Sequence, residues 1–345
     1  MRSLAETRPN YIDYAKAIAI YCVVLGHYTY AFDFSYEPSP IWSAMHMITL
    51  FHMPFFFFVS GMLYKKIKVK SAISKGWIQL LKPYLIMSAL VSVIMLIEQS
   101  YTDGLNIKYM AKVAIGIFSA NDFPFAVRNW SSPLWFCYSL FIIKVVYSFL
   151  FNRSWGGYFI IILCLLGVAM MYIGNKFPLR IDSSLVGFVF FTIGAKGSEV
   201  LESFIDSSSK IKIFTLLFAL FVLSISAYFN LNLHQRQGLS INAMYFGKYP
   251  FLFLVSGISG TAVLLLLSSF LCRIKYKMVL TISNGTIVVL GFHWTIYKLA
   301  ISWWFSSYSV LIAMVVALID LMICYCLILV FNRYLPSVLG NRKLN

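Results

Sequence analysis

Three polar residues near the start of the chain interrupt an otherwise apolar stretch. In YIDYAKAIAIYCVVLGHYTYAF, Asp13 and Lys16 come first and His27 lies eleven residues beyond Lys16. In a helix that spacing covers about 16 Å and returns to nearly the same face. A histidine titrates near neutrality and can serve as a general base or as a nucleophile that carries an acyl group. The alternative for Asp13 and Lys16 is a local ion pair between residues i and i+3.

Two more histidines fall inside apolar runs. His52 stands beside Pro54 in MHMITLFHMPFFFFVSGML, and His293 lies in SNGTIVVLGFHWTIYKLA. An ionisable side chain inside a bilayer costs roughly 2.5–3.5 kcal/mol on insertion scales, so each one is a candidate for function. With His27 they predict one polar chamber at middle depth, although each could instead hydrogen-bond a neighbouring helix. His46 and His234 are interpreted as solvated surface residues.

Lys82 precedes Pro83 inside an apolar stretch, where an ammonium group needs a partner. Lysines are frequent just before it, between residues 65 and 75, and could meet a phosphorylated ligand. Simple anchoring of the chain to the membrane is the other explanation for them. On the opposite side of the membrane, Trp135, Asp182 and Asn242 are candidate groups for binding a polar substrate.

The elements that must position these residues are membrane helices. The chain has 345 residues, of which 60% are hydrophobic and only 12% charged, which excludes a soluble protein. A spanning helix needs about 20 mostly apolar residues. About ten stretches qualify, near 12–33, 42–64, 77–97, 133–151, 157–174, 184–201, 211–229, 249–271, 279–304 and 306–331. A shorter stretch at 108–120 is expected to be extramembrane, as an interfacial helix.

The net charge of +16 predicts the orientation of these helices. Basic residues concentrate in alternate loops, which are expected on the cytoplasmic side, and this places both termini in the cytoplasm. Nucleic-acid binding is not expected, because the basic residues lie in short loops with no soluble domain to hold a duplex. The fold class is therefore all-α, a multi-pass protein of the inner or plasma membrane.

Several other kinds of site and segment are not expected. The six cysteines lie in or beside apolar runs without metal-binding spacing, so neither a disulfide framework nor a metal site is predicted. The first apolar run has no small-residue cleavage site after it and is interpreted as a retained span. No linker or repeat divides the chain, and residues 1–345 are expected to form a single transmembrane domain.

Several of the apolar segments with polar residues resemble the acyltransferase-3 membrane family, and within it the fucose 4-O-acetylase-like branch. The resemblance is carried by IDYAKAIAIYCVVLGH, FHMPFFFFVSGMLYKK and SSPLWFCYSLF, and more loosely by INAMYFGKYPFLFLVSGISG and SNGTIVVLGFHW. His27 stands at the family's essential histidine. Lys16 stands where much of the wider family has arginine, which keeps the charge and loses bidentate phosphate binding.

The resemblance implies transfer of an acetyl group from cytoplasmic acetyl-CoA, a co-substrate, to a sugar hydroxyl on an extracytoplasmic glycan or lipid-linked sugar. His27, Asp13 and His52 are then the expected catalytic residues, with Lys16 and Lys82 at the donor. Trp135, Asp182, Asn242 and His293 are expected at the acceptor. The alternatives are a polysaccharide exporter or secondary transporter, which also has polar residues at mid-membrane depth, and a catalytically silent member.

Overall fold

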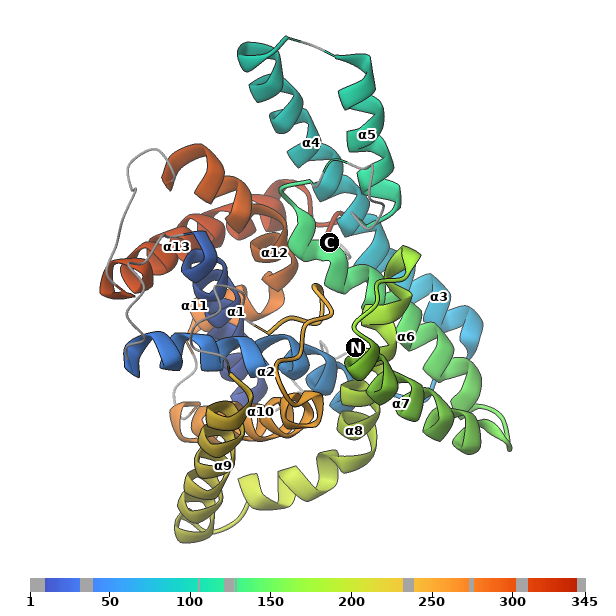
Figure 1. The fold of residues 1–345 in the computed structure, drawn as a ribbon, viewed down its shortest axis with the longest axis vertical. Helices are drawn as coiled ribbons and strands as arrows, with labels where there is room; N and C mark the ends of the chain where they lie inside the picture. The colour runs from blue at the N-terminus through green and yellow to red at the C-terminus, as the bar shows by residue number, and fades with distance from the viewer. Residues whose placement is uncertain are drawn as a thin grey trace. The chain divides into compact units, whose positions relative to one another are not determined.

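The structure is a computed structural model, and the residues that it describes form helices joined by short connections (Figure 1). These residues are 10–31, 40–104, 106–120, 127, 129–231, 239–272, 276–301 and 310–339. In this part of the chain the only β-type pairing is an isolated antiparallel bridge between Ser240 and Tyr245. The predicted fold class is confirmed: the protein is an all-α, multi-pass membrane protein.

Eight helical runs within the described residues are long and apolar enough to cross a membrane. They are residues 45–62 of α2 (Pro40–Met62), the run from α3 (Val69–Gly76) through the π-helical turn η2 (Trp77–Leu81) to α4 (Lys82–Thr102), Ser132–Phe151, which includes α6 (Trp135–Phe151), α7 (Gly156–Ile173), Pro178–Ile205, which includes α8 (Ile181–Ile205), α9 (Ser209–Asn230), α10 (Pro250–Leu271) and α13 (Val310–Tyr334). Two shorter helices, α11 (Lys277–Asn284) and α12 (Thr286–Ile296), form a ninth span if the broken pair is counted as one.

The first predicted span is the helix α1 (Asn10–Ala31), which has 22 residues. It is not among the eight apolar runs. The mean hydropathy of α1 is lowered by Asp13, Lys16 and His27. The residues that predict chemistry therefore also make this helix harder to recognise as a membrane span. The expected helix at 108–120 is present as α5 (Ile107–Phe118).

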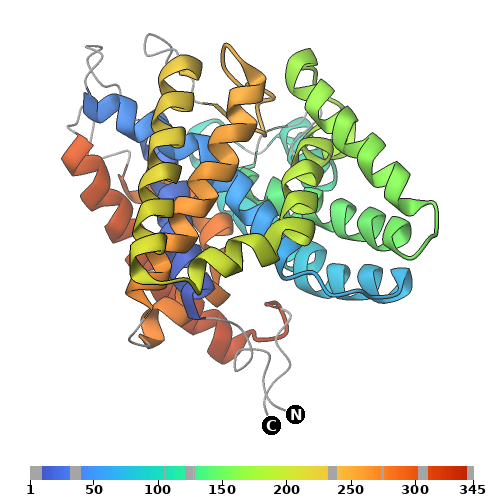
Figure 2. The same cartoon turned by 90° about the horizontal axis from the view of Figure 1, so that it is seen from below.

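The helices group into two compact units, each described separately. The first unit draws on residues 1–64, 189–286 and 307–318. In it, α1 packs against α2, α10 and α11, and α10 also packs against α2 and α9. Figure 2 shows α9 and α10 side by side. This packing surrounds α1, the helix with the predicted catalytic residues, with protein.

Close helix contacts in the first unit depend on glycine at two positions. A Cβ atom at Gly61 of α2 would lie 1.9 Å from the carbonyl oxygen of Phe191 in α8. A Cβ atom at Gly194 of α8 would lie 2.0 Å from the carbonyl oxygen of Phe58 in α2. Both distances are far below van der Waals contact, so the two backbones cross closely only because neither position has a side chain.

The second unit draws on residues 65–188, 287–306 and 319–345. Here the run from α3 to α4 lies antiparallel to α6. The side chains of Ser148 and Asn152, at the end of α6, donate to the carbonyl of Ile67, whereas Tyr84 of α4 packs edge-on against Tyr138 near the start of α6. The α6 helix also packs against α7, and α4 against α5.

Candidate active site

The polar residues at the start of α1 meet the end of α11 in the first unit. Lys16 Nζ donates to the carbonyl oxygen of Ser283 at 2.5 Å, and Ser283 Oγ donates to Asp13 Oδ1 at 2.6 Å. Asp13 is buried, with 6% of its surface exposed. The ammonium group thus binds a carbonyl at the C-terminal, negative end of the α11 dipole. Asp13 and Lys16 share one partner residue, which fixes the start of α1 relative to α11.

His52 lies beside α1 at the level of His27. A Cβ atom at Gly26 would lie 4.0 Å from Cε1 of His52, so the imidazole faces the α1 backbone next to His27. His52 Nδ1 donates to the carbonyl of Ile48 at 2.8 Å, since a carbonyl can only accept. The neutral ring therefore keeps its lone pair on Nε2, the form required of a general base.

Asn242 lies in a short turn between α9 and α10 that is organised by a buried residue of α9. Asn230 donates through Nδ2 to the carbonyl of Phe246 and accepts from the backbone N–H of Tyr249 through Oδ1. Gly247 has φ +85, and a Cβ atom there would lie 2.6 Å from the Asn230 carbonyl oxygen. Asn230 is fully buried and holds the loop against the end of α9.

In the second unit His293 repeats the arrangement of His52. It is fully buried on α12, and its Nδ1 donates to the carbonyl of Val289 at 2.6 Å. A Cβ atom at Gly291 would lie 3.1 Å from Sδ of Met87 and 3.6 Å from Leu134, so α12 lies close to α4 and to the segment before α6. Because His293 is in the second unit and His27 and His52 are in the first, the common chamber stays a prediction.

Trp135 begins α6 and is buried, with 4% of its surface exposed. The non-helical segment before it is held by a network of buried polar groups. Asn129 Nδ2 donates to Ser92 Oγ at 2.6 Å and to the carbonyl of Ser88, and Ser131 Oγ donates to Ser88 Oγ at 3.0 Å. Ser88 and Ser92 are on α4, inside the predicted span. Irregular backbone at that depth is stable only when protein surrounds and satisfies it.

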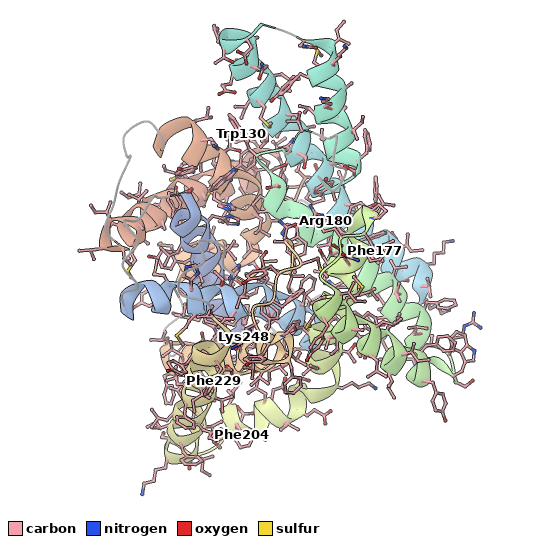
Figure 3. All side chains as sticks on the ribbon, in the orientation of Figure 1. Trp130, Phe177, Arg180, Phe204, Phe229 and Lys248 are labelled. Atoms are coloured by element: carbon pink, nitrogen blue, oxygen red, sulfur yellow. The ribbon has the colours of Figure 1, made fainter. Side chains whose placement is uncertain are left out.

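Lys82 has the partner that its position requires. Its Nζ donates to the carbonyl oxygen of Ser337 at 3.1 Å, in the turn that follows α13. Asp182, in the first turn of α8, is fully buried. Two residues before it, Arg180 donates through Nε and Nη2 to the carbonyl of Ala120 at 3.0 and 2.8 Å (Figure 3). The guanidinium binds a carbonyl just after the C-terminus of α5, a role typical of a cation at a helix C-terminus.

Comparison with protein families finds an acyltransferase domain, acyltransferase-3, that matches residues 10–338, nearly the whole chain. The chain belongs to the acyltransferase-3 family. No curated protein and no solved structure matches it. Family membership indicates a membrane acyltransferase, and the match covers every predicted site residue. It does not separate the fucose 4-O-acetylase-like branch from the rest of the family.

Within this acyltransferase domain the structure adds residues to the predicted set. Ser283 is the partner of Asp13 and Lys16, and Asn230 holds the loop that contains Asn242. Two ionisable side chains, Lys144 of α6 and Asp320 of α13, lie inside spans. Asp320 is fully buried and accepts from Cys324 Sγ at 3.5 Å. A search for single charges within apolar runs would have found Lys144 and Asp320, whereas no sequence signal identifies the partner of Asp13.

One interpretation of a histidine is wrong. His46 was expected to be solvated, but only 4% of its surface is exposed, because α2 buries it in the first unit. Its carbonyl accepts from Thr49 Oγ1 at 2.7 Å. His234 lies outside the described residues. Among the residues that the structure describes, no group of three or more His, Cys, Asp or Glu side chains could hold a metal ion.

Proposed function

We propose that this acyltransferase moves an acetyl group from cytoplasmic acetyl-CoA to a sugar hydroxyl of a cell-surface glycan or lipid-linked sugar, in the inner or plasma membrane. The observation that supports it best is the arrangement along α1. Lys16 is fixed at one end of the helix by Ser283, and His27 lies about 16 Å further along, with the His52 imidazole beside the preceding residue. The helix therefore separates the Lys16 ammonium group, where the donor phosphates would bind, from the His27 imidazole, where the acetyl group would be transferred.

At the entrance, Lys16 and Lys82 would attract the phosphates of the donor. Lysine binds phosphate as a point charge, without the bidentate geometry of arginine. Both ammonium groups already donate to a backbone carbonyl, which orients them and leaves their charge in place. Asp13 would act as a positioning residue, because its carboxylate holds Ser283 and through it the same carbonyl that Lys16 binds.

At middle depth, His27 would accept the proton of the acceptor hydroxyl as its oxygen attacks the thioester carbonyl. The C–S bond then breaks, and the leaving thiolate takes the proton from the imidazolium. In the relay version, the imidazole attacks first and displaces the thiolate of coenzyme A. The hydroxyl oxygen then takes the acetyl group from the imidazole, and the hydroxyl proton passes to the thiolate. His52 and His293 would hold the acceptor or stabilise the developing charge, and Trp135, Asp182 and Asn242 would bind the sugar.

The test is acetyl transfer by purified protein in vesicles, with labelled acetyl-CoA and mass spectrometry of the glycan. His27→Ala should lower turnover by about 10²–10⁴-fold, the usual contribution of a general base. His46→Gln, a second histidine in the same unit, should leave turnover unchanged. Near wild-type turnover in His27→Ala would refute the assignment. Intact surface acetylation with lost export in a deletion strain would favour an exporter.

A further inference from the structure

A cluster of cations lies at the start of the run from α3 to α4, which is antiparallel to α6 in the second unit, and it has no acidic partner among the described residues. We call it the lysine platform, and it consists of Lys65, Lys66, Lys68, Lys70 and Lys75, all exposed. None of the five ammonium groups forms a hydrogen bond or ion pair with any residue that the structure describes. The one interaction found for them is Lys66 Nζ over the ring of Phe151, 5.6 Å from its centre.

The platform is held in place by α6. The carbonyl of Ile67, in the middle of the platform, accepts from Ser148 Oγ at 2.8 Å and from Asn152 Nδ2 at 2.9 Å. Further along, α3 packs on α6 through its buried residues, Ala72 and Gly76, and a Cβ atom at Gly76 would lie 2.6 Å from the ring of Phe141. The lysines therefore project from a fixed backbone, and their charges are concentrated in one place.

The carboxylates that the structure describes in the same unit do not neutralise the platform. The described acidic residues of this unit are Glu98, Asp103, Asp182 and Asp320. Glu98 and Asp103 are at the far end of α4, about 35 Å or more from Lys75 along the helix. Asp182 and Asp320 are fully buried. Among the residues that the structure describes in this unit, no carboxylate pairs with the platform, so its charge is available to a ligand.

Apolar side chains are exposed beside the same lysines. Ile73, Trp77 and Ile78 have exposed fractions of 46%, 49% and 43%. A soluble phosphate compound would be bound by the cations alone and would make no use of these side chains. A phospholipid offers both a negative headgroup and acyl chains, and a tryptophan at this boundary is typical of a membrane interface.

We propose that the lysine platform binds the headgroups of anionic phospholipids in the cytoplasmic leaflet, with Ile73, Trp77 and Ile78 inserted among the first methylenes of the acyl chains. A polybasic segment beside a membrane helix attracts anionic lipid in this way. The bound lipid anchors the long helix that continues to Lys82. Lipid binding at the platform does not depend on the acetyl-transfer reaction.

The test uses the full chain purified from mixed phosphatidylcholine and phosphatidylglycerol, with retained lipid counted by native mass spectrometry. The wild type should retain phosphatidylglycerol in preference to phosphatidylcholine. Replacing all five platform lysines with glutamine should lower that preference about tenfold, since each lysine adds to the attraction. Replacing all five with arginine should preserve it. The matched control is Lys108→Gln with Lys112→Gln on α5, which should change nothing.

A second variant separates lipid from the nucleotide donor. Ile73→Ser, Trp77→Ser and Ile78→Ser together should lower phosphatidylglycerol retention while leaving coenzyme A binding unchanged. Equal retention by the wild type and the glutamine variant would overturn the proposal. Displacement of the retained lipid by coenzyme A would also overturn it and would assign the platform to the donor. Helicity and size-exclusion profiles establish that each variant is folded.

Discussion

At the scale of single residues, the candidate site of this acyltransferase consists of a few polar side chains inside an apolar protein. Each of them is held by a specific hydrogen-bond partner. Asp13 and Lys16 both bind Ser283, one through its hydroxyl and the other through its carbonyl. His52 and His293 each donate Nδ1–H to the carbonyl four residues earlier, so the neutral ring has its lone pair on Nε2. A hydroxyl fixes Asp13, and a backbone carbonyl fixes each of the other three side chains.

The Asp13 carboxylate should be coupled energetically to Ser283. Ser283→Ala should lower the free energy of unfolding by about 1–3 kcal/mol, because it removes a hydrogen bond to a buried carboxylate. In a double-mutant cycle with Asp13→Asn, thermal unfolding in detergent should give an interaction energy of about 0.5–3 kcal/mol. Ser203→Ala, at an exposed position of α8, is the control and should stay within about 0.5 kcal/mol of the wild type. Additive effects would contradict the pairing.

Lys16 and Lys82 should affect the donor more than the fold. Removing either charge, in Lys16→Ala or Lys82→Ala, should weaken acetyl-CoA binding measured by calorimetry by about tenfold, a cost of one charge-assisted hydrogen bond. Lys16→Arg and Lys82→Arg keep the charge and should retain more affinity than the alanine variants. Unchanged affinity in both alanine variants would rule out the donor role and assign these lysines a structural role.

At the scale of elements, close backbone approach decides which helices can be neighbours. Lipid chains are as apolar as leucine, so helices in a membrane associate through tight packing and hydrogen bonds. The α2 and α8 helices meet at Gly61 and Gly194, and α3 and α6 meet at Gly76. These positions determine the arrangement around the site, although none of them takes part in chemistry.

The crossing of α2 and α8 gives a matched pair of glycine variants. Gly194→Ala should lower the free energy of unfolding by about 1–3 kcal/mol or more, because its Cβ would meet the Phe58 carbonyl. Gly197→Ala, one turn further along the same helix, has no atom within 4 Å of its Cβ and should be neutral or stabilising. Thermal unfolding in detergent checks both. Equal melting temperatures for the two variants would show that the helices do not approach as described.

At the scale of the whole molecule, the excess of basic residues predicts the direction in which the chain enters the membrane. Most of the net charge of +16 comes from alternate loops, and the lysine platform is the densest of these. The predicted orientation puts the platform, Lys16 and Lys82 on the donor side and Asn242 on the acceptor side.

This orientation can be measured by cysteine labelling in a variant without the six native cysteines. Lys75→Cys should be protected from an impermeant maleimide in intact cells and should react after lysis, because the charge distribution predicts that the platform faces the cytoplasm. Lys176→Cys, in the exposed connection after α7, should react in intact cells. The opposite pattern would reverse the direction of transfer proposed for this acyltransferase.

Much of the fold follows from the amino-acid composition and from the length and helical periodicity of the apolar runs. An apolar run of about 20 residues must form a helix in lipid, because no water is present to satisfy its backbone. The spans, α5 and the polar positions on α1 and α2 were therefore predictable. His46 was mistaken for a surface residue because its depth was judged from sequence position, whereas its burial depends on the helices that surround α2.

The partners of the polar residues depend on tertiary structure. Ser283 lies 270 residues from Asp13, Ala120 lies 60 residues from Arg180, and Asn129 reaches back 37 residues to Ser92. Helical period places a residue on a face but does not say which helix covers that face. Since every span is similarly apolar, packing of small residues and satisfaction of buried polar groups select the neighbours, and these depend on the three-dimensional arrangement of the whole chain.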